Sequence, residues 1–186
     1  CASAAPSATP VPATPAVALA AGHAGHQLVA AARSRGLLAA SGPEKTVRLF
    51  RTEDGSLART YRSHAGDITA LRLSDDGRYL AAATASGVVL VWTNASSRLA
   101  SRLGAGQARV LAMTFGPERL LATAAEDGRV TVWNLRNGRV VRTLRVGVRN
   151  ARPSSFSGDG RFLFATSQSG GIHVWTLSPV QAGSGT

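Results

Sequence analysis

Four aromatic residues recur along the chain at intervals of 42, 41 and 42 residues. They are Phe50, Trp92, Trp133 and Trp175, and each ends a short run rich in valine, leucine or isoleucine. A period of about 40 residues is typical of repeat architectures, in which each segment folds into one small unit and stacks on its neighbours. The chain is therefore predicted to fold into four similar units.

Turn signals divide each repeat into short strands. In the third repeat the predicted strands are residues 110–115, 120–124, 130–133 and 140–144. Tight turns separate them, because Asp-Gly and Asn-Gly pairs accept the positive φ angles that short hairpins need. Four antiparallel strands in one small sheet are expected for each repeat, although the last repeat lacks a segment for its fourth strand.

The pattern resembles the WD-repeat β-propeller family, whose repeats often begin near a Gly-His pair and end a strand with tryptophan. Gly22-His23 precedes Phe50 by 27 residues, counted from the histidine, and Ser63-His64 precedes Trp92 by 28. The resemblance covers residues 16–178. It implies an all-β fold, a β-propeller with four antiparallel four-stranded blades that is either a whole small propeller or half of a larger ring.

The resemblance is weaker at the polar positions. In the family, a histidine, a turn aspartate, a serine or threonine and the tryptophan share one hydrogen-bond network. The turn positions here hold Glu44, Ser86, Asp127 and Ser169, and no repeat keeps both the histidine and the aspartate. Apolar packing between strands is therefore expected to hold the blades together.

Composition divides the chain into three parts. Residues 1–15 are predicted to be a disordered tether rich in alanine, proline and threonine, and residues 179–186 a flexible tail. The propeller spans residues 16–178, with repeats at about 24–62, 65–103, 106–145 and 148–178. Residues 16–21 either belong to the tether or, as we predict, supply the missing strand and close the ring, because open strand edges promote aggregation.

Four blades are few for a propeller. Two chains could form a homodimer with one eight-bladed ring, or the chain could be part of a larger propeller.

Cys1 is the only cysteine, which excludes an internal disulfide and a zinc site made of several cysteines. A terminal cysteine before such a tether resembles a mature bacterial lipoprotein. That resemblance implies lipidation of Cys1, attachment to the lipid bilayer and a location at the cell envelope outside the cytoplasmic membrane. The alternative is a fragment of a larger intracellular WD-repeat protein, which would be cytoplasmic.

The net charge of +11 arises from 21 basic and 10 acidic residues, and Lys45 is the only lysine. The arginines are spread over all four repeats and match no nucleic-acid-binding motif, so nucleic acid is not expected as a partner. His23, His26, His64 and His173 form no zinc-type pair backed by carboxylates. Most acidic residues flank glycines in predicted turns, which is typical of turn formers.

The sequence therefore predicts a non-catalytic scaffold for protein–protein interaction, with no catalytic residue, metal site or cofactor. The candidate partner-binding loops carry His23, Lys45, His64, Arg129 and Arg149. The alternative from another class is a propeller enzyme, such as a hydrolase or a quinone-dependent dehydrogenase.

Overall fold

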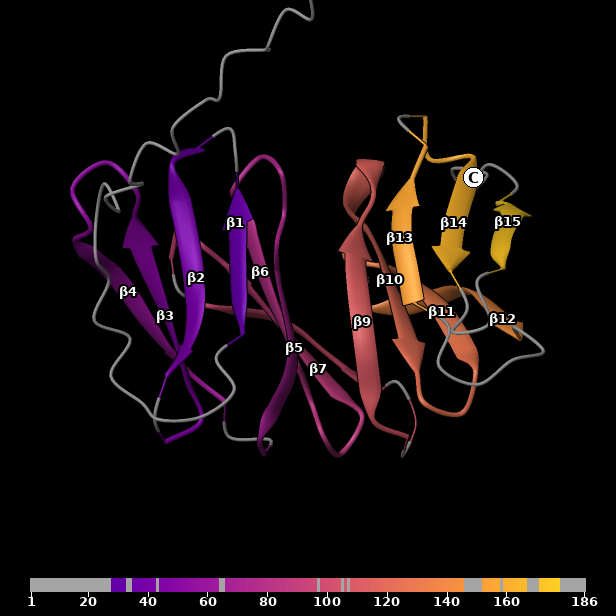
Figure 1. Cartoon of the computed structure of the whole chain (residues 1–186), viewed down its shortest axis with the longest axis horizontal. Helices are drawn as coiled ribbons and strands as arrows, with labels where there is room; N and C mark the ends of the chain where they lie inside the picture. Colours follow the sequence, from indigo (N-terminus) through magenta and orange to yellow (C-terminus); the bar gives the residue numbers. More distant parts are fainter. Residues whose placement is uncertain are drawn as a thin grey trace, which may run out of the picture.

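A computed structural model describes residues 28–32, 35–42, 44–63, 66–96, 98–104, 106, 108–145, 152–157, 159–166 and 171–177. These residues form four antiparallel sheets that follow one another along the chain (Figure 1), and we name them blades 1 to 4. The predicted all-β propeller fold is confirmed. Residues 1–27 and 178–186 lie outside the described part, so the tether, the tail and the closing strand at 16–21 remain predictions.

The strands have nearly the bounds that the turn signals predict. Blade 1 consists of β1 (Val29–Ala32), β2 (Leu37–Gly42), β3 (Thr46–Arg51) and β4 (Leu57–Arg62). Blade 2 consists of β5 (Ile68–Leu73), β6 (Tyr79–Thr84), β7 (Val88–Thr93) and β8 (Leu99–Gly104). Blade 3 consists of β9 (Val110–Phe115), the 3-10 turn η2 (Pro117–Arg119), β10 (Leu120–Ala125), β11 (Arg129–Asn134) and β12 (Arg139–Arg145). In the described residues blade 4 has three strands, β13 (Arg152–Phe156), β14 (Phe162–Thr166) and β15 (Ile172–Thr176).

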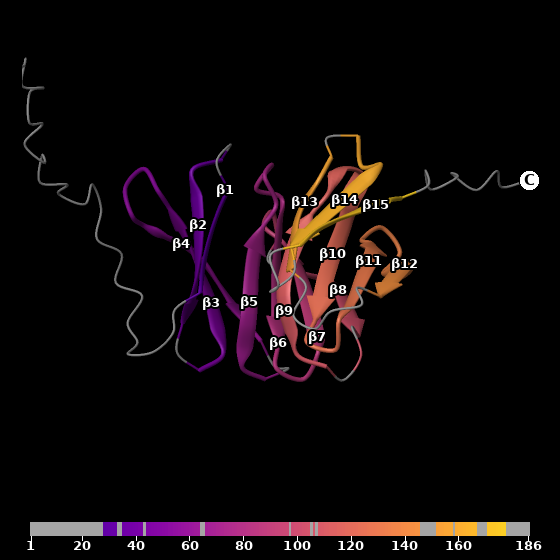
Figure 2. The same cartoon turned by 45° about the vertical axis from the view of Figure 1, so that its right-hand side comes forward.

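The four blades lie in chain order in an arc, with blade 1 at one end and blade 4 at the other (Figures 1 and 2). Their first strands, β1, β5, β9 and β13, lie next to one another in a row. Because side chains alternate between the two faces of a strand, each inner sheet presents one apolar face to the blade before it and one to the blade after it. The core is therefore divided into layers between blades.

The recurring aromatic residues occupy these layers. Trp92 is 4% exposed and lies in the cluster between blades 1 and 2, and Trp133 is 5% exposed in the cluster between blades 2 and 3. Trp175 is half-buried against the layer between blades 3 and 4. In each case the aromatic side chain points toward the preceding blade, whose facing side chains are mostly alanine, valine and leucine.

Side-chain hydrogen bonds also cross every boundary between blades. The Tyr61 hydroxyl donates to Asn94 Oδ1 at 2.9 Å between blades 1 and 2, and Arg72 Nε donates to the Met113 carbonyl at 2.9 Å between blades 2 and 3. Arg142 Nη1 donates to the Thr176 carbonyl at 2.8 Å between blades 3 and 4. These bonds fix the positions of blades that apolar packing alone would let slide.

Candidate functional site

A groove of about 840 Å³ lies where the first strands of the four blades end. Ala30 and Ala31 of blade 1 line one side of it, and most of the remainder is lined by the ends of β5, β9 and β13 with the turns that follow them, together with Arg136 from the turn between β11 and β12. All four blades therefore contribute to one concave surface, which exists only because the blades stack in an arc.

Three aromatic side chains from three blades line the groove: Tyr79, Phe115 and Phe156. The rings of Tyr79 and Phe115 are stacked, with their centroids 6.5 Å apart. Phe156 lies directly over Gly116, where an added Cβ would be only 2.8 Å from the nearest ring atom. Glycine at this position thus allows blade 4 to pack closely against the turn of blade 3.

The turns after β5 and β13, which line the groove, share one hydrogen-bond pattern. In blade 2, Ser74 Oγ donates to Asp76 Oδ1 at 2.6 Å and accepts from the Tyr79 amide at 2.9 Å, while the Arg78 amide donates to the same carboxylate at 3.0 Å. In blade 4, Ser157, Asp159, Arg161 and Phe162 repeat these contacts. The acidic residues in these turns are turn formers, as the sequence predicts.

These contacts hold the two carboxylates in the ionised form. Burial alone would raise the pKa of Asp76, but hydrogen bonds from Ser74 and the Arg78 amide outweigh it and lower that pKa below its ordinary value. The hydrogen bond from Ser157 and that from the Arg161 amide lower the pKa of Asp159. Both side chains therefore act as fixed negative charges within the turns.

Four exposed arginines surround the aromatic side chains: Arg72, Arg78, Arg119 and Arg136. Arg72 is held by its bond to the Met113 carbonyl, and Arg78 lies 3.5 Å from Asp76 in an exposed ion pair of little energy. Arg119 follows Glu118 in the turn η2, where both residues adopt positive φ, 63° and 53°. The turn thereby places the Arg119 side chain on the groove surface.

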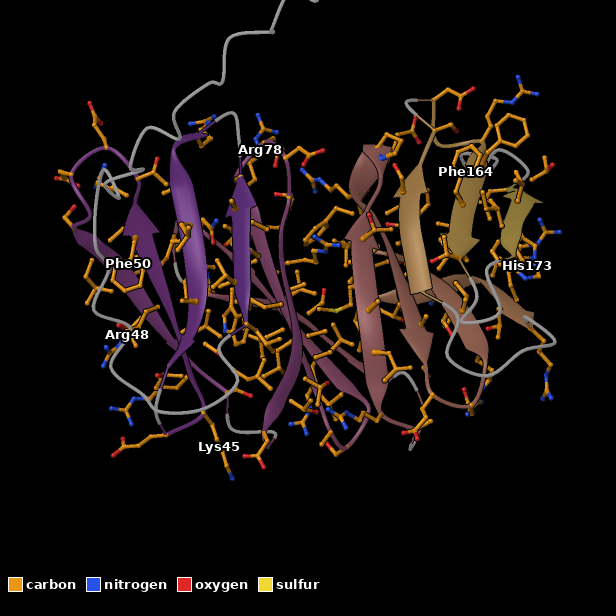
Figure 3. The ribbon with its side chains drawn as sticks, viewed as in Figure 1. Lys45, Arg48, Phe50, Arg78, Phe164 and His173 are labelled. Atoms are coloured by element: carbon orange, nitrogen blue, oxygen red, sulfur yellow. The ribbon has the colours of Figure 1, made fainter. Side chains whose placement is uncertain are left out.

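The loops predicted to bind a partner lie elsewhere. Lys45 is in the turn between β2 and β3, at the opposite end of the blades from Arg78 (Figure 3). Arg129 follows the equivalent turn of blade 3 and is bound to Asp127, with Nε 2.6 Å from Oδ2. His23, His64 and Arg149, like Cys1, are outside the described residues, so a common binding surface for the five residues remains a prediction.

The groove itself was missed by the sequence prediction. The sequence does contain a signal for it, a Ser-x-Asp-Gly-Arg turn at residues 74–78 that recurs at 157–161.

His173, the histidine that lies within the described residues, stacks on Trp175 at 5.7 Å on the side of blade 4 that faces blade 3. Within the described ranges no three His, Cys, Asp or Glu side chains are grouped so that they could bind a metal ion. In the same ranges there is no helix with the length and apolar character that a membrane span requires.

The pH dependence of stability follows from the aspartates. The pKa values of Asp54, Asp76, Asp127 and Asp159 are all lowered from the ordinary 3.8. The folded state then binds fewer protons than the unfolded state, so stability is complete above the ordinary value and declines as pH falls through the lowered values. Urea unfolding should show a constant midpoint down to about pH 5 and a decrease below about pH 4. The double variant Asp76→Asn, Asp159→Asn should lose less stability over that acid range, and an identical decrease would contradict the assignment.

Comparisons with known proteins agree with the repeat analysis. The family described as WD domain, G-beta repeat (WD40) matches residues 55–93. The chain is similar to small ribosomal subunit protein RACK1y of Oryza sativa subsp. japonica, with 28% identity over 73% of this chain and 42% of the relative. It is also similar to the target of rapamycin complex subunit wat1 of Schizosaccharomyces pombe, with 31% identity over 76% of this chain and 45% of the relative.

Solved structures share the fold at lower identity. A crystal structure of the computationally designed Ika4 protein matches with a TM-score of 0.71 and 19% identity, covering 84% of this chain and 94% of that chain. The designed Ika8 protein matches with a TM-score of 0.67 and 20% identity, covering 79% of this chain and 45% of that chain. These matches support a WD-repeat β-propeller, and the chain spans less than half the length of the curated relatives named above.

The same relatives correct one expectation. RACK1y, autophagy-related protein 16 of Arabidopsis thaliana and wat1 are cytoplasmic proteins of eukaryotes and not bacterial envelope lipoproteins. The predicted lipid-anchored location outside the cytoplasmic membrane is therefore wrong, and the cytoplasmic alternative is the one that the relatives support. The error came from giving weight to Cys1 and its tether, which carry no information about the propeller.

Proposed function

We propose that this protein is a non-catalytic WD-repeat scaffold whose groove binds an acidic segment of a protein partner. The observation that carries the proposal is the composition of the groove, in which three aromatic side chains and four exposed arginines come from neighbouring blades and the arginines outnumber the three carboxylates of Asp75, Asp76 and Glu118. Relatives named as a ribosomal subunit protein and as a complex subunit support a role in protein assemblies.

The chemistry of the groove favours an acidic partner. Aromatic residues and arginine are enriched at the energetic centres of protein interfaces, where rings supply apolar contact and guanidinium groups bind carboxylates in pairs of hydrogen bonds. The net charge of +11 would also attract an acidic segment before contact. Stacked Tyr79 and Phe115 offer an apolar surface for an aromatic or aliphatic side chain between two acidic residues of the partner.

The groove carboxylates do not favour the enzyme alternative. Asp76 accepts hydrogen bonds from Ser74 and the Arg78 amide, and its lowered pKa keeps it ionised. A general acid or base works best when its pKa lies near the working pH. The carboxylate instead stabilises the turn that holds Arg78 at the groove.

A binding measurement tests the proposal. The probe is a fluorescein-labelled peptide of alternating glutamate and phenylalanine residues, followed by fluorescence anisotropy. The double variant Arg119→Glu, Arg136→Glu should bind the peptide at least about tenfold more weakly, which corresponds to the loss of about one charge-assisted hydrogen bond. Added salt should weaken binding of the unmodified protein, because exposed charges are screened.

The matched control lies at the other end of the blades. The variant Lys45→Glu, Arg129→Glu has the same change in net charge but alters the loops predicted from sequence, and it should keep the peptide affinity. If this control loses binding while the groove variant retains it, the partner surface is the loop face with Lys45 and Arg129. If both variants lose the same amount of peptide affinity, the effect comes from the change in net charge, and specific binding of the peptide in the groove is contradicted.

A further inference from the structure

The two outermost faces of the arc contact no other described sheet. On blade 4, Ile172 is 74% exposed and Val174 is 55% exposed. The equivalent residues of blades 1 to 3, one repeat length apart, are all at most 2% exposed: Val47, Leu49, Val89, Val91, Val130 and Val132. Blade 4 thus carries a face built like an interior face but left open to solvent.

Blade 1 ends the arc with the opposite kind of face. In blades 2, 3 and 4 the face that bears the recurring aromatic residue packs on the preceding blade. Blade 1 has the same face, with Phe50 buried beside Ala40 and Leu38, while Val29 and Leu57 are 57% and 54% exposed. Blade 4 therefore exposes the kind of face on which a next blade packs in the rest of the arc. Blade 1 has the kind of face that blades 2, 3 and 4 pack onto the blade before them.

The outer faces of blades 1 and 4 differ from the interior faces in the size of the side chains at two equivalent positions. Phe164 of β14 occupies the position that Ala39, Ala81 and Ala122 fill in the other blades, where each alanine is 0% exposed under the next blade. A blade that covers Phe164 needs more space than the interior faces leave. Blade 1 has Phe50, a smaller side chain, where the other blades have tryptophan, although Phe50 itself is buried.

The charged position of blade 1 fits the same contact. Arg48 occupies the place of Leu90, which is 4% exposed in the layer between blades 1 and 2. If blade 1 packs on a blade 4, Arg48 lies against Phe164, where a guanidinium group can interact with the face of the ring. Figure 3 shows Arg48 and Phe50 at one end of the arc and Phe164 at the other, so a single arc cannot bring them together.

We propose that two copies of this chain pack blade 4 of each onto blade 1 of the other and so close an eight-bladed ring. The contact continues the interface that already occurs three times within the chain, and two such head-to-tail contacts close under two-fold symmetry. The inference rests on the proposed scaffold and identifies its first partner as a second copy.

The experiment measures the mass of the full chain in solution by light scattering coupled to gel filtration. The unmodified protein should have twice the chain mass of 19.2 kDa. Phe164→Arg should have the mass of one chain, because two arginines would meet in the contact. The double variant Phe164→Arg, Arg48→Glu should regain the doubled mass through an Arg–Glu pair. Leu99→Arg, a change at a 50% exposed residue of blade 2 outside both end faces, should leave the doubled mass unchanged.

Several outcomes would overturn the proposal. A single-chain mass for the unmodified protein would mean that a segment of the same polypeptide covers these faces, and a mass above two chains would mean open head-to-tail growth. A doubled mass for Phe164→Arg, or no recovery in the charge-reversed double variant, would show that Arg48 and Phe164 do not meet. Circular dichroism of each variant establishes that the sheets are folded.

The peptide assay separates this inference from the proposed function. Phe164→Arg leaves the groove residues unchanged. If this variant is folded, has the mass of one chain and still binds the acidic peptide, then peptide binding by the groove does not depend on formation of the ring. If the unmodified protein has the mass of two chains but does not bind the peptide, the proposed ring is supported and the proposed binding of an acidic partner is contradicted.

Discussion

Replacing Trp133 with alanine is expected to lower the free energy of unfolding by about 3–5 kcal/mol, the usual range for removing a large buried aromatic side chain. Trp133 is 5% exposed and packs with Val91 and Leu121 between blades 2 and 3. Its Nε1 also donates to Thr123 Oγ1 at 3.0 Å in a buried hydrogen bond. The substitution thus creates a cavity and removes a hydrogen bond at one boundary. Urea unfolding followed by circular dichroism measures the change.

Trp175→Ala is the matched control. It removes the same side chain from the equivalent position of blade 4, but Trp175 is only half-buried and its blade has one described neighbour. The loss should therefore be clearly smaller than for Trp133. Equal losses for the two variants would mean that burial between blades does not determine what these residues contribute.

Gly87→Ala is expected to destabilise the protein by about 3 kcal/mol, through backbone strain and overpacking together. Gly87 has a φ of +78° in the turn between β6 and β7, a conformation that disfavours a side chain. An added Cβ would also lie 2.3 Å from the Gly106 carbonyl oxygen and 2.8 Å from that of Ala108. Because both obstacles are backbone atoms, the segment that enters blade 3 would have to move.

Gly138→Ala separates strain from overlap. Its φ is +67°, but the nearest atom to an added Cβ is Leu103 Cδ2 at 3.9 Å, which is ordinary contact. This variant should lose only about 1–2 kcal/mol, the strain alone. Thermal or urea unfolding of the two variants side by side checks the difference, and a loss for Gly87→Ala no greater than that for Gly138→Ala would contradict the close approach of Gly87 to the Gly106 segment.

Much of the fold could be predicted because its signals are local. The spacing of Phe50, Trp92, Trp133 and Trp175 gives the number of blades, and Asp-Gly and Asn-Gly pairs give the hairpins within them. A turn such as 74–77 depends on its own side chains, since Ser74 and Asp76 supply the hydrogen bonds that shape it. Such patterns are visible in a single sequence before any tertiary contact is known.

The groove could not be predicted in the same way. Tyr79, Phe115 and Phe156 belong to three different blades, and only the stacking of the sheets brings them to one surface. Similarly, the positive φ angles of Glu118 and Arg119 could not be predicted, because neither position holds the glycine or asparagine that usually indicates this conformation. Sequence reasoning placed the partner on the loops with Lys45 and Arg129 because repeat loops are the usual binding elements, and that assignment remains a prediction.

In the described residues each blade is one stretch of chain, and its main contacts are with the blades just before and just after it (Figure 2). The angle between two blades is therefore decided separately at each layer, and no residue determines how many units the assembly contains. Gene duplication or loss of one repeat would leave all remaining layers intact and alter only the meeting of first and last faces. Ring size would in this sense be a property of closure, so Phe164 and Arg48 on the end faces are the residues that test the proposed ring.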